Sequence, residues 1–158
     1  MKTNMIKILA ILLLVILQLS FFSKWSFFSV IPNLIYLVSL VLLLRGFFQD
    51  ALLVASLGGL FLDLASPLRF GIYTLLLLAV LLLLNFVILK AVPPPNIGWI
   101  YFFLVMIFLF LNLIIFLYAR IPPGPQIIYD ALINGFWGII VYFLTGRFLK
   151  PQEEIRLV

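Results

Sequence analysis

Residues 97–119 read IGWIYFFLVMIFLFLNLIIFLYA, a run of 23 residues without a charged side chain. A helix needs roughly 20 consecutive apolar residues to cross the hydrocarbon core of a bilayer. The run lacks the alternation of apolar and polar residues that marks a membrane β-barrel strand, which reads as segments of about ten residues. It therefore predicts a transmembrane helix and sets the fold class of the chain.

Five more apolar runs surround this one, separated by short polar or proline-rich breaks. The predicted helices cover about residues 5–22, 27–44, 47–64, 71–89, 97–119 and 126–149. We expect an all-α integral membrane protein with six transmembrane helices, in which residues 1–158 form a single domain. Asn33 to Leu44 spans only about 18 Å, so the second helix is short, or its Pro32-Asn33 end dips into the bilayer. We expect Pro32 in or near its first turn.

Composition supports this fold class and excludes several kinds of chemistry. Of the 158 residues, 66% are hydrophobic and 9% are charged, and the chain has neither Cys nor His. A water-soluble domain is typically about 25% charged. Disulfides, Cys or His metal sites and Cys or His nucleophiles are excluded. We find no phosphate-binding loop, serine nucleophile elbow or paired-carboxylate motif. We therefore expect no cofactor and no enzymatic activity.

The net charge of +5 reflects topology rather than nucleic-acid binding, because the basic residues are scattered and form no patch. The positive-inside rule places the more basic set of loops in the cytoplasm. With both termini cytoplasmic, the inner basic residues are Lys2, Lys7, Arg45, Lys90, Arg147, Lys150 and Arg156. The outer ones are then Lys24, Arg69 and Arg120.

One face of the third predicted helix combines small residues with an acid. Residues four apart share a helix face, which gives the stripe Ala51, Ala55, Gly59 and Asp63. Small residues let another helix approach closely within a bilayer. The stripe is thus a candidate packing face for a partner's transmembrane helix. Alternatively, Asp63 is a helix-end residue that reaches the interface and pairs with Arg69.

The sixth predicted helix carries a second small and polar face. It contains Asp130, Asn134, Gly135 and Gly138. The two faces pack against each other, or each receives a partner's helix, and the sequence leaves both possibilities open. For Asp130 we favour compensation of the positive helix N-terminus. We interpret Asp50, near Arg45, as a solvated acid in the first turn of its helix.

Single polar and aromatic residues have structural interpretations. We expect one interhelical hydrogen bond from each of the helical amides Gln18, Asn85 and Asn112. Trp25, Trp99 and Tyr101 lie near predicted helix ends and fit an aromatic belt, whereas Trp137 is expected to pack inside.

Several short motifs, in this order and spacing, resemble a known family. The run Pro32-Asn33-Leu34 opens the second helix. Gly46 follows, then Gly59-Leu60-Phe61-Leu62-Asp63-Leu64 on the third helix, and Gly71 before the fourth. The pattern resembles the bacterial rod-shape-determining MreD family, which shows a Pro-Asn-Leu opening, a Gly-Leu-x-x-Asp segment and a later Gly. The motif region covers about 40 residues, and no motif of helices five and six matches.

The resemblance implies a fold, a place and partners. It implies a non-enzymatic subunit of the cell-elongation machinery in the bacterial cytoplasmic membrane. The implied partners are an MreC-like membrane protein, a wall-synthesis transpeptidase, a RodA-type glycosyltransferase and MreB filaments. The family's fold looks like that of the substrate-binding S-components of ECF vitamin transporters. An S-component-like, vitamin-binding subunit is therefore the alternative, with a pocket formed by Asn33, Asp63, Arg69, Arg120 and Asp130.

Overall fold

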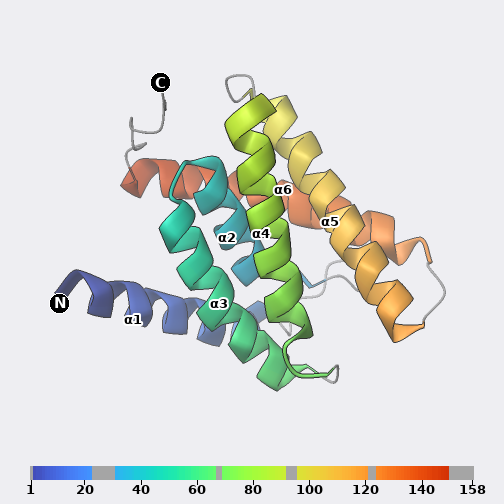
Figure 1. Ribbon diagram of the computed structural model, residues 1–158, viewed down its shortest axis with the longest axis horizontal. Coiled ribbons are helices and arrows are strands. Elements are labelled where there is room, and N and C mark those ends of the chain that lie inside the picture. The colour runs from blue at the N-terminus through green and yellow to red at the C-terminus, as the bar shows by residue number, and fades with distance from the viewer. Residues whose placement is uncertain (1, 23–30, 67–68, 92–95, 121–123, 150–158) are drawn as a thin grey trace.

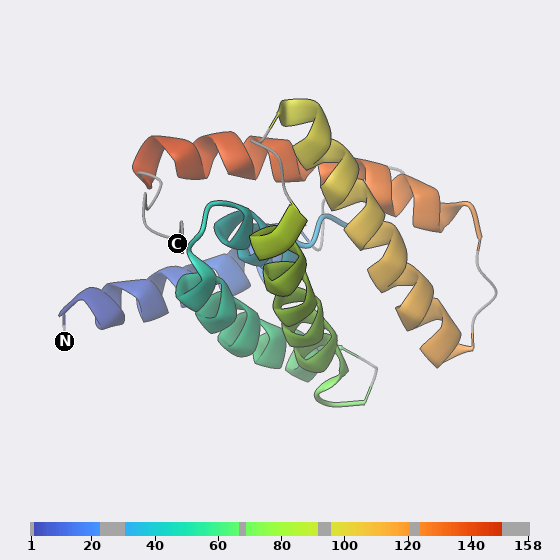
Figure 2. The ribbon, with the colours of Figure 1, turned by 45° about the horizontal axis from the view of Figure 1, so that its top comes forward.

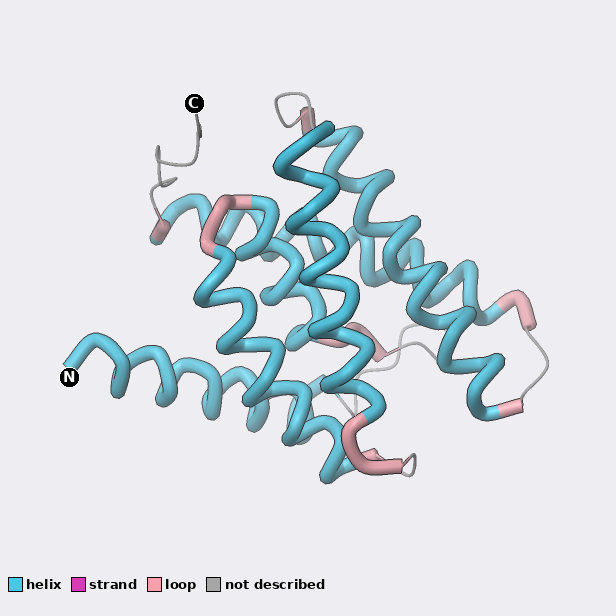
Figure 3. Tube along the Cα trace, in the orientation of Figure 1, coloured by secondary structure: helices cyan, strands magenta, loops and turns pink. Residues whose placement is uncertain are grey.

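The computed structural model describes residues 2–22, 31–66, 69–91, 96–120 and 124–149. These residues form helices joined by short connections, and no strand occurs among them (Figure 3). Several predicted features lie outside the described residues, namely Lys24, Trp25, residues 27–30, most of the two proline-rich loops, Lys150 and Arg156.

Each predicted apolar run contains a helix. The helices are α1 (Lys2–Leu17), continued by the π-helix η1 (Gln18–Phe22), α2 (Leu34–Leu44), α3 (Phe48–Ala65), α4 (Ile72–Ala91), α5 (Ile97–Ala119) and α6 (Gln126–Phe148). The prediction for α2 was wrong at its start. Residues 31–33 are not helical, so Pro32 precedes the helix instead of opening its first turn. The 11 residues of α2 extend about 16 Å.

The shortest of the described α-helices, α2, lies at the centre of the fold. Ile35, Leu37 and Val41 have no exposed surface, and a helix that is apolar on all sides is suited to full burial. On one side α2 packs against the antiparallel pair α3 and α4, and on the other against α6, which pairs with α5 (Figures 1 and 2). The first helix, α1, packs mainly against α3.

Two glycines make the sharp turns that this arrangement requires. Gly46 has φ +85° and follows α2; its N–H donates to Leu43 O, while Phe47 N donates to Leu42 O. This pair of hydrogen bonds is a Schellman motif, which ends α2 and directs the chain into α3. Gly71 has φ +96° and immediately precedes α4. Both positions favour glycine because side chains disfavour positive φ.

Within the described residues, three helices are long and apolar enough to cross a membrane: α3, α5 and α6. The other apolar helical stretches among the described residues are shorter, at Met5–Ser20, Leu34–Leu44 and Ile72–Phe86. Large apolar side chains cover much of the outer surface, including Leu75, Leu83, Phe110 and Leu117. The fold is therefore an all-helical bundle with a largely apolar exterior.

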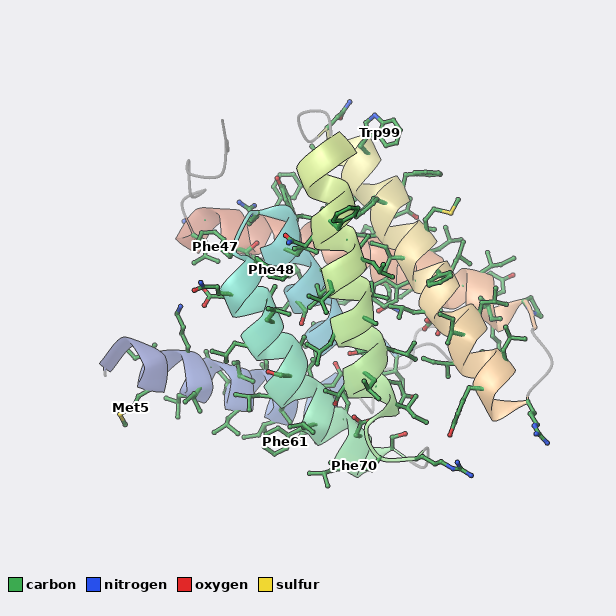
Figure 4. The ribbon with its side chains drawn as sticks, viewed as in Figure 1. Met5, Phe47, Phe48, Phe61, Phe70 and Trp99 are labelled. Carbon is green, nitrogen blue, oxygen red and sulfur yellow. The ribbon has the colours of Figure 1, made fainter. Side chains whose placement is uncertain are left out.

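The start of α1, the α2–α3 turn and the end of α6 lie on the same side of the molecule (Figures 1 and 2). Side-chain contacts hold them there. Lys7 of α1 forms a 2.5 Å ion pair with Asp50 of α3, and Arg45 Nε donates to Thr145 Oγ1 at 3.0 Å. In Figure 4, Phe47 and Phe48 mark this end of α3, and Phe70 lies beyond the opposite end.

Candidate functional site

The start of α4 is capped by a buried acid from the preceding helix. Asp63 is only 3% exposed. Its Oδ1 accepts from Tyr73 N at 2.8 Å, and its Oδ2 accepts from Thr74 N at 3.1 Å and from Thr74 Oγ1 at 2.5 Å. The first backbone N–H groups of a helix have no partner within the helix. A carboxylate there is also stabilised by the partial positive charge of the helix N-terminus.

This capping role differs from the predicted pairing with Arg69. Arg69 is exposed, and within the described residues no Lys or Arg nitrogen lies within 4.0 Å of the Asp63 carboxylate. Asp63 neutralises a helix end instead of forming an ion pair at the interface. The turn through Gly71 makes this possible, because it reverses the chain and places the start of α4 beside the end of α3.

The start of α2 is capped by amides from three parts of the chain. Asn33 Oδ1 accepts from Tyr36 N at 3.3 Å. Leu34 N donates to Gln18 Oε1 at 2.7 Å, and Asn33 N donates to Asn134 Oδ1 at 2.9 Å. Gln18 opens the π-helix that follows α1, and Asn134 lies in the middle of α6. The buried start of the short central helix is therefore satisfied by α1 and α6 side chains.

Tyr36 connects the two capped helix starts. Its hydroxyl donates to Tyr73 O at 3.1 Å, and the two tyrosine rings meet edge to face with centroids 6.3 Å apart. Tyr73 N in turn donates to Asp63. We call the connected set the capped junction; it comprises Gln18, Asn33, Tyr36, Asp63, Tyr73, Thr74 and Asn134.

The family-motif positions gather around the capped junction. Asn33 and Asp63 belong to it, and Pro32, which is buried, directly precedes Asn33. Gly59 lies against Thr74, and Gly71 forms the turn before α4. Leu60 differs, since it is 39% exposed and points outward.

The small-residue stripe of α3 is covered by the chain itself. Ala51 and Ala55 have no exposed surface, and Gly59 is buried. A Cβ at Gly59 would lie 2.9 Å from Thr74 Cα, so glycine is what lets α3 and α4 approach. The stripe is thus an internal packing face in this fold. We correct the expectation of a partner-binding face here, because no accessible surface remains on it.

The second small face, on α6, is also internal. A Cβ at Gly135 would meet Val105 of α5 at 2.5 Å, and one at Gly138 would meet Leu104 of α5 at 2.5 Å and Leu37 of α2 at 3.3 Å. The two small faces therefore do not pack against each other, which was one of the two possibilities left open by the sequence. The face on α3 receives α4, and the face on α6 receives α5 and α2.

Asp130 lies in the second turn of α6 and is held by amides. Asn112 Nδ2 of α5 donates to Asp130 Oδ2, and Asn134 Nδ2 donates to Asp130 Oδ1 at 3.2 Å and to Asp130 O at 2.9 Å. These side-chain contacts, rather than the backbone N–H groups of the first turn, are its partners, so the dipole interpretation was incomplete. The predicted interhelical bonds of Gln18 and Asn112 are confirmed, whereas none is seen for Asn85 within the described residues.

From the sequence, Arg45 was counted among the inner basic residues and placed near Asp50, but no partner on another helix was predicted for it. Its guanidinium lies 4.1 Å from the centroid of the Tyr142 ring, donates to Tyr142 O, and occupies the space left by Gly146. It joins the end of α2 to the last turns of α6. Asp50 pairs with Lys7 rather than being simply solvated near Arg45.

Two surface cavities lie away from the capped junction. A groove of about 230 Å³ between α4 and α5 is lined by apolar residues, among them Val80, Leu84 and Phe103. A shallow hollow of about 410 Å³ near the start of α5 is lined by Asn96, Gly98, Trp99 and Phe102. No group of three or more Asp or Glu side chains that would suit a metal is found in the described part of the chain.

Comparisons with protein-family models, curated proteins and solved structures give no match for this chain.

Proposed function

We propose that this protein is a non-enzymatic membrane subunit of the bacterial cell-elongation machinery, similar to the MreD family. In this proposal it spans the cytoplasmic membrane six times, has both termini in the cytoplasm, and scaffolds an MreC-like protein and peptidoglycan synthases. MreB filaments are the cytoplasmic component of the same assembly.

The convergence of the motif positions carries the proposal. Asn33, Asp63 and Gly71 are separated by up to 38 residues in the sequence. Asn33 and Asp63 nevertheless belong to the one capped junction, and Gly71 makes the turn just before the helix that Asp63 caps. Residues that act together in the fold are those expected to be retained together in a family motif. Their shared structural task supports a common fold with the family that the motif resembles.

Polar side chains that are bonded within the chain support a scaffolding role. Asp63 and Asn134 are bound within the chain, as is Asp50. What the described surface offers outward is mainly Leu and Phe. Such a surface suits helix packing and lipid contact better than bond-making chemistry.

The vitamin-binding alternative finds less support in the geometry. Three of the five side chains assigned to its pocket are already hydrogen-bonded within the fold. Asn33 caps its own helix α2, Asp63 caps α4, and Asp130 accepts from Asn112 of α5. The apolar groove between α4 and α5 contains none of the five. A ligand pocket needs a few convergent polar groups to fix orientation.

The grouping of charges supports the proposed orientation. Lys7, Arg45 and Arg147 come from the start of α1, the end of α2 and the last turn of α6, which lie at one side of the bundle (Figure 1). Arg69 and Arg120 lie after α3 and at the end of α5. The more basic side is the one expected in the cytoplasm.

Affinity purification of the full chain from native bacterial membranes tests the function. We expect an MreC-like protein and wall-synthesis enzymes to co-purify with the chain and with Gly98→Ala, a position with no atom within 4 Å of an added Cβ. Well-folded protein that recovers none of these partners would contradict the scaffold. A vitamin retained through purification would favour the alternative.

A further inference from the structure

Two arginines from distant parts of the chain lie together at the end of α6. The Arg45 guanidinium occupies the space left open by Gly146, and Arg147 is the next residue along the chain. Arg147 is exposed and Arg45 is partly exposed. Within the described residues, the ion pair at this side of the bundle, Lys7–Asp50, uses neither arginine. The segment after α6 is balanced in charge, with the side chains Lys150, Glu153, Glu154 and Arg156.

The Arg45 guanidinium is held in place and keeps donors for a further acceptor. Its Nε donates to Thr145 Oγ1 at 3.0 Å, and its Nη2 donates to Tyr142 O. The group also lies over the Tyr142 ring, 4.1 Å from the centroid. A guanidinium has five N–H groups, so these two hydrogen bonds leave others for a second partner. Its planar fork of donors suits a phosphate group.

The surface beside these arginines is apolar and belongs to a helix long enough to cross a membrane. Phe143 and Leu144 are 57% and 56% exposed, and they share a helix face with Arg147, which follows them by four and three residues. Phe136, which is 59% exposed, extends this face toward the start of α6. An anionic phospholipid has the matching order of properties, acyl chains followed by a phosphate. A soluble anion would leave the phenylalanine and leucine side chains uncovered.

We propose that Arg45 and Arg147 bind the phosphate of an anionic phospholipid whose acyl chains lie against Phe143 and Leu144. The lipid belongs to the leaflet on this side of the bundle, which is the cytoplasmic one in the proposed topology. The proposal rests on the membrane insertion stated under the proposed function, but not on the protein partners stated there. Each basic side chain near an anionic membrane surface increases affinity about fivefold. The bound lipid joins the end of α2 to the end of α6.

Native mass spectrometry of the purified full chain tests this site. Phosphatidylglycerol and phosphatidylcholine with identical acyl chains are titrated into the protein in a neutral detergent, and the Kd of the first bound lipid is measured. We expect phosphatidylglycerol to bind on the order of tenfold more tightly. Arg147→Gln is expected to weaken phosphatidylglycerol binding about fivefold and to leave phosphatidylcholine binding unchanged, whereas Arg147→Lys keeps most of the affinity. Arg69→Gln, which removes an exposed cation after α3, is the matched control and is expected to keep the preference.

Equal affinity of the unsubstituted chain for the two lipids would overturn the proposal. A full preference for phosphatidylglycerol in Arg147→Gln would do the same. An equal loss of preference in Arg69→Gln would contradict it as well, because net charge rather than this site would then decide. Displacement of the lipid by glycerol 3-phosphate would assign the arginines to a free phosphate, and displacement by polyglutamate to an acidic protein segment. None of these results depends on which proteins co-purify, so the lipid site and the proposed scaffold are tested separately.

Discussion

Replacing Asp63 by Ala removes the acceptor for three donors at the start of α4. The donors are Tyr73 N at 2.8 Å, Thr74 N at 3.1 Å and Thr74 Oγ1 at 2.5 Å. Asp63 is almost fully buried, so water has little access to replace the lost carboxylate. The Thr74 hydroxyl can rotate toward another acceptor, but the two backbone N–H groups are fixed by the helix.

The expected loss follows from these two N–H groups. A buried donor left without an acceptor costs about 1–3 kcal/mol, and removal of a helix cap about 0.5–2 kcal/mol. We expect Asp63→Ala to lower the free energy of unfolding by about 2–4 kcal/mol. Asp63→Asn retains one acceptor oxygen and is expected to lose about half as much.

Equilibrium unfolding of purified protein in mixed micelles measures this loss, with tryptophan fluorescence as the signal. Asp50→Ala is the matched control, because it removes an acid from the same helix. Its ion pair with Lys7 is partly exposed, and such pairs contribute about 0–1 kcal/mol.

Hydrogen exchange identifies the cause of the destabilisation. In Asp63→Ala the amides of Tyr73 and Thr74 are expected to exchange faster, while those of α5 stay protected. The reasoning would be refuted by an unfolding free energy within about 0.5 kcal/mol of the unsubstituted protein. An equal loss in Asp50→Ala would refute it as well.

Other parts of the structure give three further predictions. Gly59→Ala places a Cβ 2.9 Å from Thr74 Cα and is expected to separate α3 from α4. We expect it to lower the free energy of unfolding by about 1–3 kcal/mol. Gly98→Ala, where an added Cβ meets nothing within 4 Å, is expected to leave the free energy of unfolding unchanged. Asn134→Leu orphans the backbone N–H just before α2 and is expected to cost about 1–3 kcal/mol in the same assay; unchanged stability would show that this bond is dispensable. A reporter fused after Gly124 is expected to behave as external, and a cytoplasmic signal there would exclude the proposed topology.

The sequence predicts the helices well because long apolar runs leave few alternatives. The run at residues 97–119 matches α5 residue for residue. The start of α2 was missed because the apolar pattern continues through residues 27–31, while Pro32 and Asn33 determine where the helix begins. Asn33 ahead of an apolar run is a helix N-cap signal that identifies Leu34 as the first helical residue.

The candidate faces show what periodicity leaves undetermined. A four-residue spacing identified the stripe ending in Asp63, and all four of its residues are buried on one face. The spacing within α3 does not identify which helix covers that face. The turn at Gly71 brings α4 against it, and no pattern in the α3 sequence encodes that turn. The partners of Arg45 could not be predicted for the same reason, because Thr145 and Tyr142 lie about 100 residues away in the sequence.

The polar residues of this chain explain how its shortest helix occupies its centre. A helix that starts inside an apolar bundle exposes backbone N–H groups where water is scarce, and each unsatisfied group there is costly. Gln18 and Asn134 supply the acceptors that α2 needs, and Asn33 supplies one from its own side chain. A polar residue in one apolar helix of this chain is therefore best interpreted by asking which other helix begins beside it. By that criterion Asp63 belongs to α4 and Asn134 to α2.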